Sequence, residues 1–268
     1  MLTEPTLTKL RTMRLLYFAE AYESQRDNPT FQAMSFDERL GFLVDKEHAA
    51  REDKKLKNAL SVAKLRLSNA TLEALDFSPK RALDKTTVKR LSSCAWVTDS
   101  AVVVITGATG TGKSFLACAL AHEACRQGHS ALYRRVPKLL EEFRVARAEG
   151  SLHKVFNRLL RADVLVLDDF AMAPLSDLDR REFLEVIEDR HDRKATLITS
   201  QLATERWHDF LADPTVADAI CDRLLHRAIR FDLKGPSKRK PDLPTDLLSL
   251  RPIAILQSLP TPPLPAAN

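Results

Sequence analysis

The sequence predicts an α/β protein built on a parallel sheet with helices on both faces. From Ala101 onward, short apolar runs alternate with helical segments, a pattern typical of parallel strands joined by helices. Glycine is scarce, with 7 residues, and aromatic residues make up only 6% of the chain, which argues against an all-β fold. With 268 residues and 44% hydrophobic content, the chain is long enough for one ordinary core, a small accessory region and a tail.

Residues 1–70 are expected to form a small all-α accessory domain. A first helical segment contains Leu7 and Leu10 and precedes a break at Asn28–Pro29. Ser35 and Glu38 have the spacing of a capping box, which predicts that a second, better-marked helix begins there. The apolar stripe of that helix consists of Leu40, Leu43 and Val44.

Basic residues concentrate in three segments, as expected for a polyanionic partner. Lys54–Arg66 lies on the predicted accessory helix, Lys80–Arg90 lies in a basic linker expected over residues 71–99, and the third segment is Lys234–Lys240. The net charge of +5 favours polyanions only weakly, and an ordinary solvated helix face would show the same pattern as the first segment. Such patches contact phosphates without reading bases, so any binding of duplex DNA should have weak sequence specificity.

Residues 100–240 contain five apolar runs and are expected to form the sheet domain. The runs are AVVVIT, ALY, VLVLDD, ATLITS and AIRFDL. Helices are expected between them: one ending at Gln127, one opened by Pro137, one around Arg180–His191, and two short ones before the last run. Residues 241–268 hold half of the 14 prolines and no glycine, so a disordered tail is expected there.

The segment GATGTGKS, from Gly107 to Ser114, has the pattern of a phosphate-binding loop. A buried strand precedes it and a helix follows, so its amides and the helix N-terminus would face phosphate oxygens. Lys113 would reach the β and γ phosphates of ATP, and Ser114 would offer its hydroxyl to Mg²⁺. The residues expected to bind the nucleotide are Gly107, Ala108, Thr109, Gly110, Thr111, Gly112, Lys113, Ser114 and Phe115.

Polar residues follow the next strands of the predicted sheet at the same edge. Asp168 is placed to hold Mg²⁺ through water, together with Ser114, and Asp169 to activate the water that attacks the γ-phosphate. The pair could instead simply cap the following turn. Among Thr199, Ser200 and Gln201, the side chain of Gln201 is the candidate for holding that water or sensing the γ-phosphate, and an ordinary strand-ending turn is the alternative.

Arg223 lies on the helix ADAICDRLLHRAI, beyond the phosphate edge of the sheet. An arginine there could reach the nucleotide of a neighbouring subunit, although a surface arginine on a basic helix would look the same.

Several segments together resemble the IstB-like ATPases of bacterial insertion sequences, relatives of the helicase loader DnaC in the AAA+ superfamily. They are GATGTGKS, VLVLDDF, EDRHDRKATLITSQL, DPTVADAICDRLLHRA and LKGPSKRK, and the likeness spans roughly residues 5–240. The resemblance implies Lys113 and Ser114 in nucleotide and Mg²⁺ binding, Asp168 and Asp169 as the Walker B acids, Gln201 near the sensor position and Arg223 as the arginine finger.

Several positions depart from the family pattern. Phe170-Ala171 replaces the usual aromatic-glycine pair, His191 stands where tyrosine is common, and Leu202-Ala203 replaces Leu-Pro. None of these changes removes a catalytic group.

The resemblance implies an ATPase that forms a homo-oligomer on duplex DNA with ATP, remodels the target and recruits the transposase of the same element, with hydrolysis resetting the assembly. A DnaC-like helicase loader is the main alternative. A small-molecule kinase is a third reading, but the sequence offers no acceptor pocket or lid for it.

The chain is expected to be cytoplasmic, with no membrane partner. Its first residues lack the apolar core of a signal peptide, and no apolar run approaches the roughly 20 residues of a membrane span. The cysteines have no metal or redox spacing and are expected to be buried thiols; they are Cys94, Cys118, Cys125 and Cys221.

Overall fold

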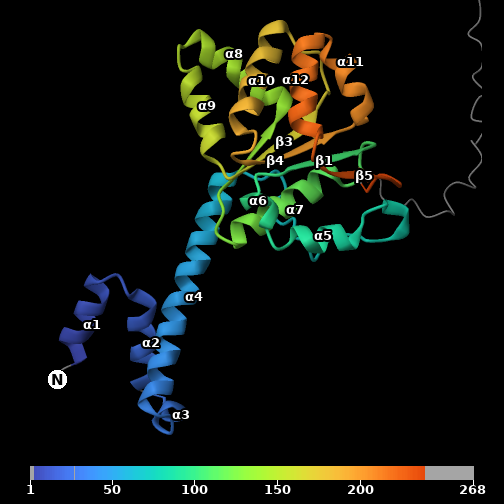
Figure 1. The fold of residues 1–268 in the computed structure, drawn as a ribbon. Coiled ribbons are helices and arrows are strands. Elements are labelled where there is room, and N and C mark those ends of the chain that lie inside the picture. The colour runs from blue at the N-terminus through green and yellow to red at the C-terminus, as the bar shows by residue number, and fades with distance from the viewer. Residues whose placement is uncertain (1–2, 27, 239–268) are drawn as a thin grey trace, which may run out of the picture.

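A parallel sheet of five strands, in the order β2-β3-β4-β1-β5, crosses the centre of the protein (Figure 1). The computed structural model describes residues 3–26 and 28–238, so the expected tail over 241–268 and the last two residues of Lys234–Lys240 lie outside the described residues. The strands are β1 (Val102–Gly107), β2 (Ala131–Arg135), β3 (Val164–Phe170), β4 (Ala195–Ser200) and β5 (Ile229–Leu233). All four strand pairings are parallel, and the predicted fold class is confirmed.

Helices cover both faces of this sheet, because its central strands are apolar on both sides. Val164 and Val166 of β3 face one buried cluster, and Leu165 and Leu167 face the other. The helices of the first face are α5 (Lys85–Leu91), α6 (Ala95–Thr98) and α7 (Lys113–Arg126). Those of the second face are α8 (Val136–Ala148), α9 (Leu152–Arg161), α10 (Asp177–Arg190), α11 (Trp207–Leu211) and α12 (Pro214–Leu225) (Figure 1).

Two helix boundaries differ from the expectation. The segment opened by Pro137 is two helices, α8 and α9, separated at Gly150, which adopts a left-handed φ of 65°. The helix carrying Arg223 ends at Leu225, since Ile229 already begins β5. Short 3₁₀ turns, η1 (Pro79–Arg81) and η2 (Thr204–Arg206), complete the described elements.

A long helix, α4 (Phe36–Ala63), projects from the body and carries the N-terminal helices on its far half (Figure 1). The predicted capping box is present: the Glu38 amide donates to Ser35 Oγ, and the Ser35 amide donates to the Glu38 carboxylate. With 28 residues, the helix is about 42 Å long. The N-terminal helices are α1 (Thr3–Thr12), α2 (Leu16–Arg26) and α3 (Pro29–Gln32). We call α1–α4 the arm.

Polar contacts join α2 to α4. The Phe18 amide donates to a Glu47 carboxylate oxygen at 3.0 Å, and the Gln25 side chain donates to the Arg39 carbonyl at 3.1 Å. Both Glu47 and Gln25 are buried. The two helices therefore form a unit of their own away from the sheet.

Residues 71–99, expected to form a linker, pack on the sheet instead. Val88, Leu91, Trp96 and Val97 are buried in the same cluster as β1 and α7. The Trp96 indole donates to the Leu91 carbonyl at 3.0 Å, which satisfies its one donor inside the core. The apolar residues among the basic ones thus anchor this segment, and the boundaries expected at residues 70, 99 and 240 stay predictions.

The expectation of buried cysteines is confirmed for three of the four. Cys94, Cys118 and Cys125 are buried and Cys221 is half-buried, and all four are free thiols. Burial raises the pKa of the three buried thiols to about 11. Within residues 3–26 and 28–238, no helix combines the length and the apolar character that crossing a bilayer requires.

Arg190, at the end of α10, is the largest buried charge of the second face. Its guanidinium donates to the carbonyls of Leu159 and Ala162, at 2.7 and 2.9 Å, and to the hydroxyl of Thr196, while its side chain is almost fully enclosed. Burial lowers the pKa of Arg190 to about 10. The residue therefore joins the end of α9 to β4, and its bonds to Leu159 and Ala162 reach carbonyls at the end of a helix, where intrahelical donors run out.

We expect Arg190→Gln to lower the free energy of unfolding by about 2–4 kcal/mol, because several buried carbonyls lose a charged donor. Urea denaturation followed by the fluorescence of the two tryptophans measures this. Arg181→Gln, which changes an exposed arginine of the same helix, is the control and should stay within about 0.5 kcal/mol of the parent. Equal effects of the two substitutions would contradict the structural role of Arg190.

Candidate nucleotide-binding site

The loop Gly107–Gly112 leaves the carboxyl end of β1 and leads directly into α7. At Gly107 a Cβ would lie 2.2 Å from the Leu233 carbonyl oxygen, so only glycine lets β1 and β5 continue side by side into the loop. At Gly110 a Cβ would meet Ser237, whose segment crosses over the loop, and the Lys238 amide donates to the Gly110 carbonyl at 2.9 Å. The chain after β5 therefore covers one side of the loop.

Lys113 lies inside the curve of this loop. Its ammonium donates to the carbonyls of Gly107 and Ala108 at 2.8 and 2.9 Å, and the residue is 6% exposed. It is also the first residue of α7, where helix amides have no intrahelical acceptor. The amides and the ammonium together form a site suited to phosphate oxygens.

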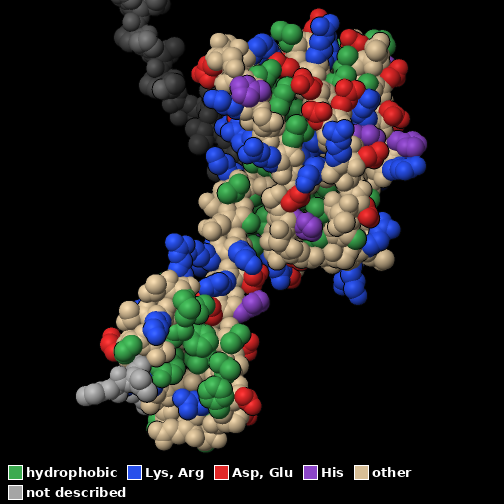
Figure 2. Space-filling view, turned by 60° about the vertical axis from the view of Figure 1, so that its left-hand side comes forward, with side chains coloured by type: hydrophobic (Ala, Val, Ile, Leu, Met, Phe, Trp, Pro, Cys, Tyr) green, Lys and Arg blue, Asp and Glu red, His purple; other side chains and the backbone are tan. Residues whose placement is uncertain are grey.

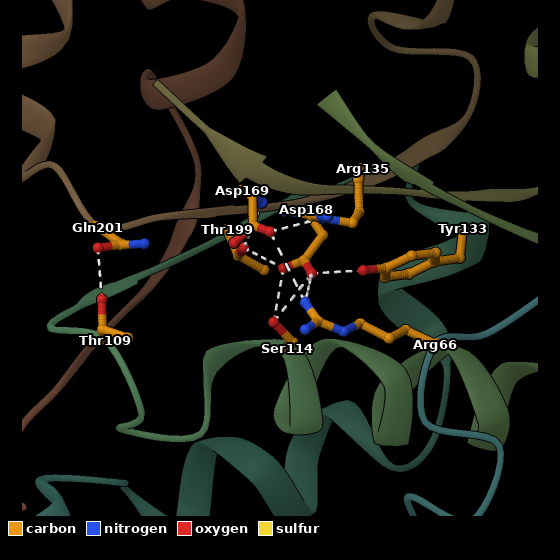
Figure 3. Close-up of polar contacts among 9 residues, drawn as sticks. All are labelled: Arg66, Thr109, Ser114, Tyr133, Arg135, Asp168, Asp169, Thr199 and Gln201. Carbon is orange, nitrogen blue, oxygen red and sulfur yellow. Dashed lines mark hydrogen bonds and ion pairs between the residues drawn. The ribbon is translucent and has the colours of Figure 1, made fainter. Parts of the chain in front are cut away.

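Asp168 is fully buried and accepts hydrogen bonds from three hydroxyl groups (Figure 3). Ser114 Oγ lies 2.9 Å from both carboxylate oxygens, Thr199 Oγ1 donates at 2.5 Å, and the Tyr133 phenol donates at 2.5 Å. Burial, and next the bond to Asp168, raise the pKa of Tyr133, so the phenol stays protonated and remains a donor. Asp168 and the loop serine, Ser114, are thus in direct contact.

A β-bulge directs the neighbouring acid, Asp169, into the cavity beside the loop. Leu167 pairs with Ile198 and Phe170 with Ser200, so Asp168 and Asp169 together oppose the single residue Thr199. If side chains alternated regularly along β3, Asp169 would point, like Leu165 and Leu167, toward the buried cluster of the second face. Instead Asp169 adopts a φ of 61° and lines the cavity above the loop, while Phe170 takes the place in that cluster.

Arginine side chains that sequence reasoning did not assign to the site neutralise these acids. Arg135 Nε lies 2.8 Å from Asp169 Oδ2, and Arg66 Nη1 lies 3.6 and 3.7 Å from Oδ2 of Asp168 and Asp169 (Figure 3). Arg135 ends β2 in register with Asp168, so its place at the sheet edge could have been found from the strand pattern. Arg66 follows α4 and carries no local signal, and it was assigned to a surface basic patch.

The three polar residues at the end of β4, Thr199, Ser200 and Gln201, have different hydrogen-bond partners. Thr199 holds Asp168, Ser200 donates to the Phe170 carbonyl at 2.9 Å, and only Gln201 reaches the loop. The Thr109 hydroxyl donates to Gln201 Oε1 at 2.6 Å, which places the amide beside the loop opposite Arg66 (Figure 3). The sequence singled out Gln201 and missed the part played by Thr199.

Arg223 does not join this site. Its guanidinium pairs with Glu188 at 2.7 Å and donates to the Ala219 carbonyl. It lines a second cavity, of about 360 Å³, that also contains Val102 and His191. Val102 is the first residue of β1, so Arg223 lies at the amino edge of the sheet, opposite the phosphate loop.

The main cavity, of about 620 Å³, has a polar end at the loop and an apolar end beside it. Apolar side chains of the segment between α4 and α5 and of β5 form the second end: Leu67, Ala74, Leu75, Leu83 and Leu233. Arg81 closes this side, pairing with Asp76 and donating to the Pro236 carbonyl, and Asp76 also pairs with Lys238. A cavity of this size and polarity fits a nucleotide with its base at the apolar end and its phosphates at the loop.

Strand, phosphate loop and helix, together with the strand β3, which ends in two acids and is separated from β1 by β4, define a P-loop nucleotide-binding fold of the AAA+ type. The model of the IstB-like ATP-binding protein family matches residues 8–243, and the chain belongs to that family. An insertion-sequence ATP-binding protein of Sinorhizobium fredii, y4pL, is 42% identical over 90% of this chain and 98% of its own length. The insertion sequence IS1162 ATP-binding protein of Pseudomonas fluorescens is 45% identical over 75% of this chain and 87% of its own length.

Solved structures of replication proteins share the fold. DnaI matches with a TM-score of 0.54 at 20% identity, covering 66% of this chain and 94% of DnaI. The DnaC helicase loader matches with a TM-score of 0.52 at 22% identity, covering 62% of this chain and 97% of that one. At these identities the likeness concerns the fold alone.

The departure from the aromatic-glycine pair has a physical consequence at Ala171. This residue adopts a φ of 62°, the left-handed region that favours glycine, immediately after the two acids. Phe170, before it, stacks on Phe183 and packs edge-on against Trp207, which fixes the chain at this point. The turn therefore has a conformation that suits glycine, and the alanine strains it.

We expect Ala171→Gly to raise the free energy of unfolding by about 0.5–1 kcal/mol, because relief of the left-handed strain exceeds the added entropy of the unfolded chain. Ala219→Gly, within the right-handed helix α12, is the matched control and should lower it by about 1 kcal/mol. Denaturant titration of both variants measures whether each substitution raises or lowers the free energy of unfolding. A destabilised Ala171→Gly protein would show that the turn is not strained.

Proposed function

We propose that the protein is an ATP-dependent, DNA-binding helper of insertion-sequence transposition. It assembles on duplex DNA with ATP, remodels the target and recruits the transposase of the same element, and hydrolysis resets the assembly. The observation that carries this proposal is the convergence of the loop, Ser114, Asp168 and Asp169 at one sheet edge, in a chain whose relatives are insertion-sequence ATP-binding proteins.

Nucleotide binding follows from the loop. Its amides and the first turn of α7 hold the phosphates, and Lys113 exchanges its two carbonyl partners for β and γ phosphate oxygens. The oxygens of Ser114 and Asp168 suit Mg²⁺, a hard cation, and they already lie 2.9 Å apart. A bound Mg²⁺ would neutralise charge on the phosphates; the hydroxyls of Thr199 and Tyr133 keep the Asp168 carboxylate oriented.

Hydrolysis needs a group that orients and deprotonates water. Asp169 lines the cavity beyond the loop, and the bulge frees its carboxylate from the second core. We assign it that role, with Gln201 orienting the water from the opposite side. We assign Arg223 to the nucleotide of a neighbouring subunit, because within its own chain it lies at the far edge of the sheet.

The DNA-binding part of the proposal rests on exposed basic residues. Figure 2 shows Lys and Arg side chains gathered around the stretch of chain between the arm and the body. The exposed members of the first two predicted segments are Lys54, Lys55, Lys57, Lys64, Lys80, Lys85, Lys89 and Arg90. Contacts from these side chains to phosphates would give binding that depends on salt and hardly on sequence. Arg66 and Arg81 of the same segments point into the nucleotide cavity and are removed from this set.

The arm also exposes large apolar side chains, as expected for a surface that binds a protein partner. They are Met13, Leu16, Tyr17, Phe36, Leu40, Val44 and Val62. In Figure 2, hydrophobic side chains, drawn green, gather on the arm. We include the transposase and a second copy of this chain among the partners of the proposal. A helicase loader would use the same chemistry, but the likeness to DnaC is one of fold, whereas relatives 42–45% identical are insertion-sequence proteins.

Electron microscopy of the protein with random-sequence duplex DNA and a non-hydrolysable ATP analogue tests the proposed function. Large assemblies are expected at low salt with the analogue and not without it. Lys113→Ala removes the phosphate-binding ammonium and should abolish nucleotide binding and assembly together. Persistent failure of the parent to assemble would overturn the proposal.

Asp169→Asn is expected to bind ATP like the parent and to hydrolyse it at least about 100-fold more slowly, because a general base is lost while the phosphate site stays intact. Assemblies on DNA should then persist after ATP is added. Single-turnover hydrolysis and an equilibrium binding assay separate the two effects. Hydrolysis at the parental rate would show that Asp169 does not activate the water.

Arg223→Ala is expected to lose about 10³-fold in hydrolysis, the scale of an arginine finger, with nucleotide binding preserved. Mixing it with the Asp169→Asn chain, which is expected to assemble but to hydrolyse its own ATP very slowly and which offers an intact Arg223 to its neighbour, should restore part of the rate. Arg227→Ala, another cation of the second cavity, is the matched control and should lose less than about 10-fold. Failure of the mixture to recover any activity would contradict the assignment between subunits.

A further inference from the structure

Arg66 connects the arm to the acids of the candidate site. Its guanidinium lies 3.6 Å from Asp168 and 3.7 Å from Asp169, and its side chain is 37% exposed within the cavity (Figure 3). It comes from the short segment that follows α4, three residues beyond Ala63. A residue of the arm's connection to the body therefore reaches the centre of the site.

The positive charge of Arg66 compensates the negative charge of two buried carboxylates. The Asp168 side chain is fully buried, and Asp169 next to it is only 13% exposed. Two adjacent carboxylates with so little water require a cation nearby. Arg135 contacts Asp169, and among the described residues Arg66 is the one cationic side chain within 4 Å of Asp168.

The same position is the one that a divalent cation would neutralise. Asp168 and Ser114 are the oxygen ligands that we assign to Mg²⁺, and Arg66 stands against the Asp168 oxygen that the Tyr133 phenol also contacts. A guanidinium and a divalent cation repel each other across a few ångströms in a poorly solvated cavity. Arg66 and Mg²⁺ therefore cannot both hold their closest positions without cost.

The chain around Arg66 is fixed to both parts of the molecule. Ala63 and Ala70, on either side, are completely buried in the cluster of the sheet, and Leu65 and Leu67 pack against it. Lys64 ends α4 in the left-handed conformation, with its amide bonded to the Leu60 carbonyl at 3.3 Å. Any shift of Arg66 must therefore be absorbed within a few residues of the end of α4.

We propose that Arg66 is a positioning residue that occupies the cation site of the Asp168–Asp169 pair until Mg²⁺ and nucleotide displace it, and that this exchange links the seating of α4 to the state of the site. The proposal rests on the proposed ATP-binding function. Arg66 acts through the two acids and through α4; it holds no reacting group.

The first experiment titrates Mg²⁺ against the binding of a fluorescent, non-hydrolysable ATP analogue to the full chain. Arg66→Gln removes the competing charge and should lower the Mg²⁺ concentration at half-saturation by about five-fold, the scale of a partly exposed ion pair. Arg66→Lys keeps a cation and should stay close to the parent. Arg147→Gln removes a similarly exposed arginine that pairs with Glu182 away from the cavity, and it should leave the half-saturation point unchanged.

The outcomes separate the two proposals. Failure of the parent to bind the analogue at any Mg²⁺ concentration would refute the ATP-binding function. If the parent binds the analogue but Arg66→Gln needs the same or a higher Mg²⁺ concentration for half-saturation, the role of Arg66 alone is refuted. A thermal unfolding measurement without nucleotide confirms that the variants compared are folded.

The second experiment follows amide hydrogen exchange over Leu60–Ala70 in the full chain, with and without Mg²⁺ and the analogue. In the parent, nucleotide should change the exchange of this segment several-fold, because Arg66 leaves the acids. In Arg66→Gln the same segment should show little response while the loop Gly107–Gly112 remains protected. Equal responses of the segment in both proteins would overturn the link to α4.

Discussion

The carboxylate of Asp168 lies in the centre of the protein with no exposed surface, and its neighbours come from four separate parts of the chain. The hydroxyls of Ser114, Thr199 and Tyr133 belong to α7, β4 and β2, and the guanidinium of Arg66 follows α4. A buried carboxylate without partners would cost several kcal/mol. The parallel sheet brings three of these partners together because its strands all end at one edge. A ligand that changes the partners of Asp168 therefore acts on several elements at once.

The sheet also separates two edges with different chemistry. The phosphate loop and the acids lie at the carboxyl edge, whereas Arg223 lies at the amino edge beside the start of β1. If Arg223 serves a nucleotide, the nucleotide must belong to another copy, with the amino edge of one subunit facing the carboxyl edge of the next. Such a head-to-tail contact cannot close as a two-fold dimer, and it gives a ring or a filament.

The parts of the site that could be predicted from the sequence are contiguous or end a strand. The loop Gly107–Ser114 is a single run, and Asp168 and Asp169 follow an apolar strand, so local pattern identifies them. Tyr133 could not be assigned, because an inward tyrosine looks like core until the register of β2 and β3 is known. Neither could the bulge, which depends on the pairing of β3 with β4. Residues 71–99 were hard to place for a related reason: most of their basic residues are exposed, Arg81 excepted, while the apolar ones between them anchor the segment in the core.

Basic residues near the end of α4 divide into two sets with different consequences. Lys54, Lys57 and Lys64 point to solvent, where each contact to a DNA phosphate would add about one released counterion to the salt dependence. Arg66, two residues beyond Lys64, points to the two acids and would add no released counterion. DNA would thus act on α4, and nucleotide on the segment that follows it.

Coupling between two binding sites is reciprocal in free energy. If the seating of α4 alters the affinity for DNA, nucleotide and DNA must each change the affinity for the other by the same factor, so the body and the arm would respond to either ligand.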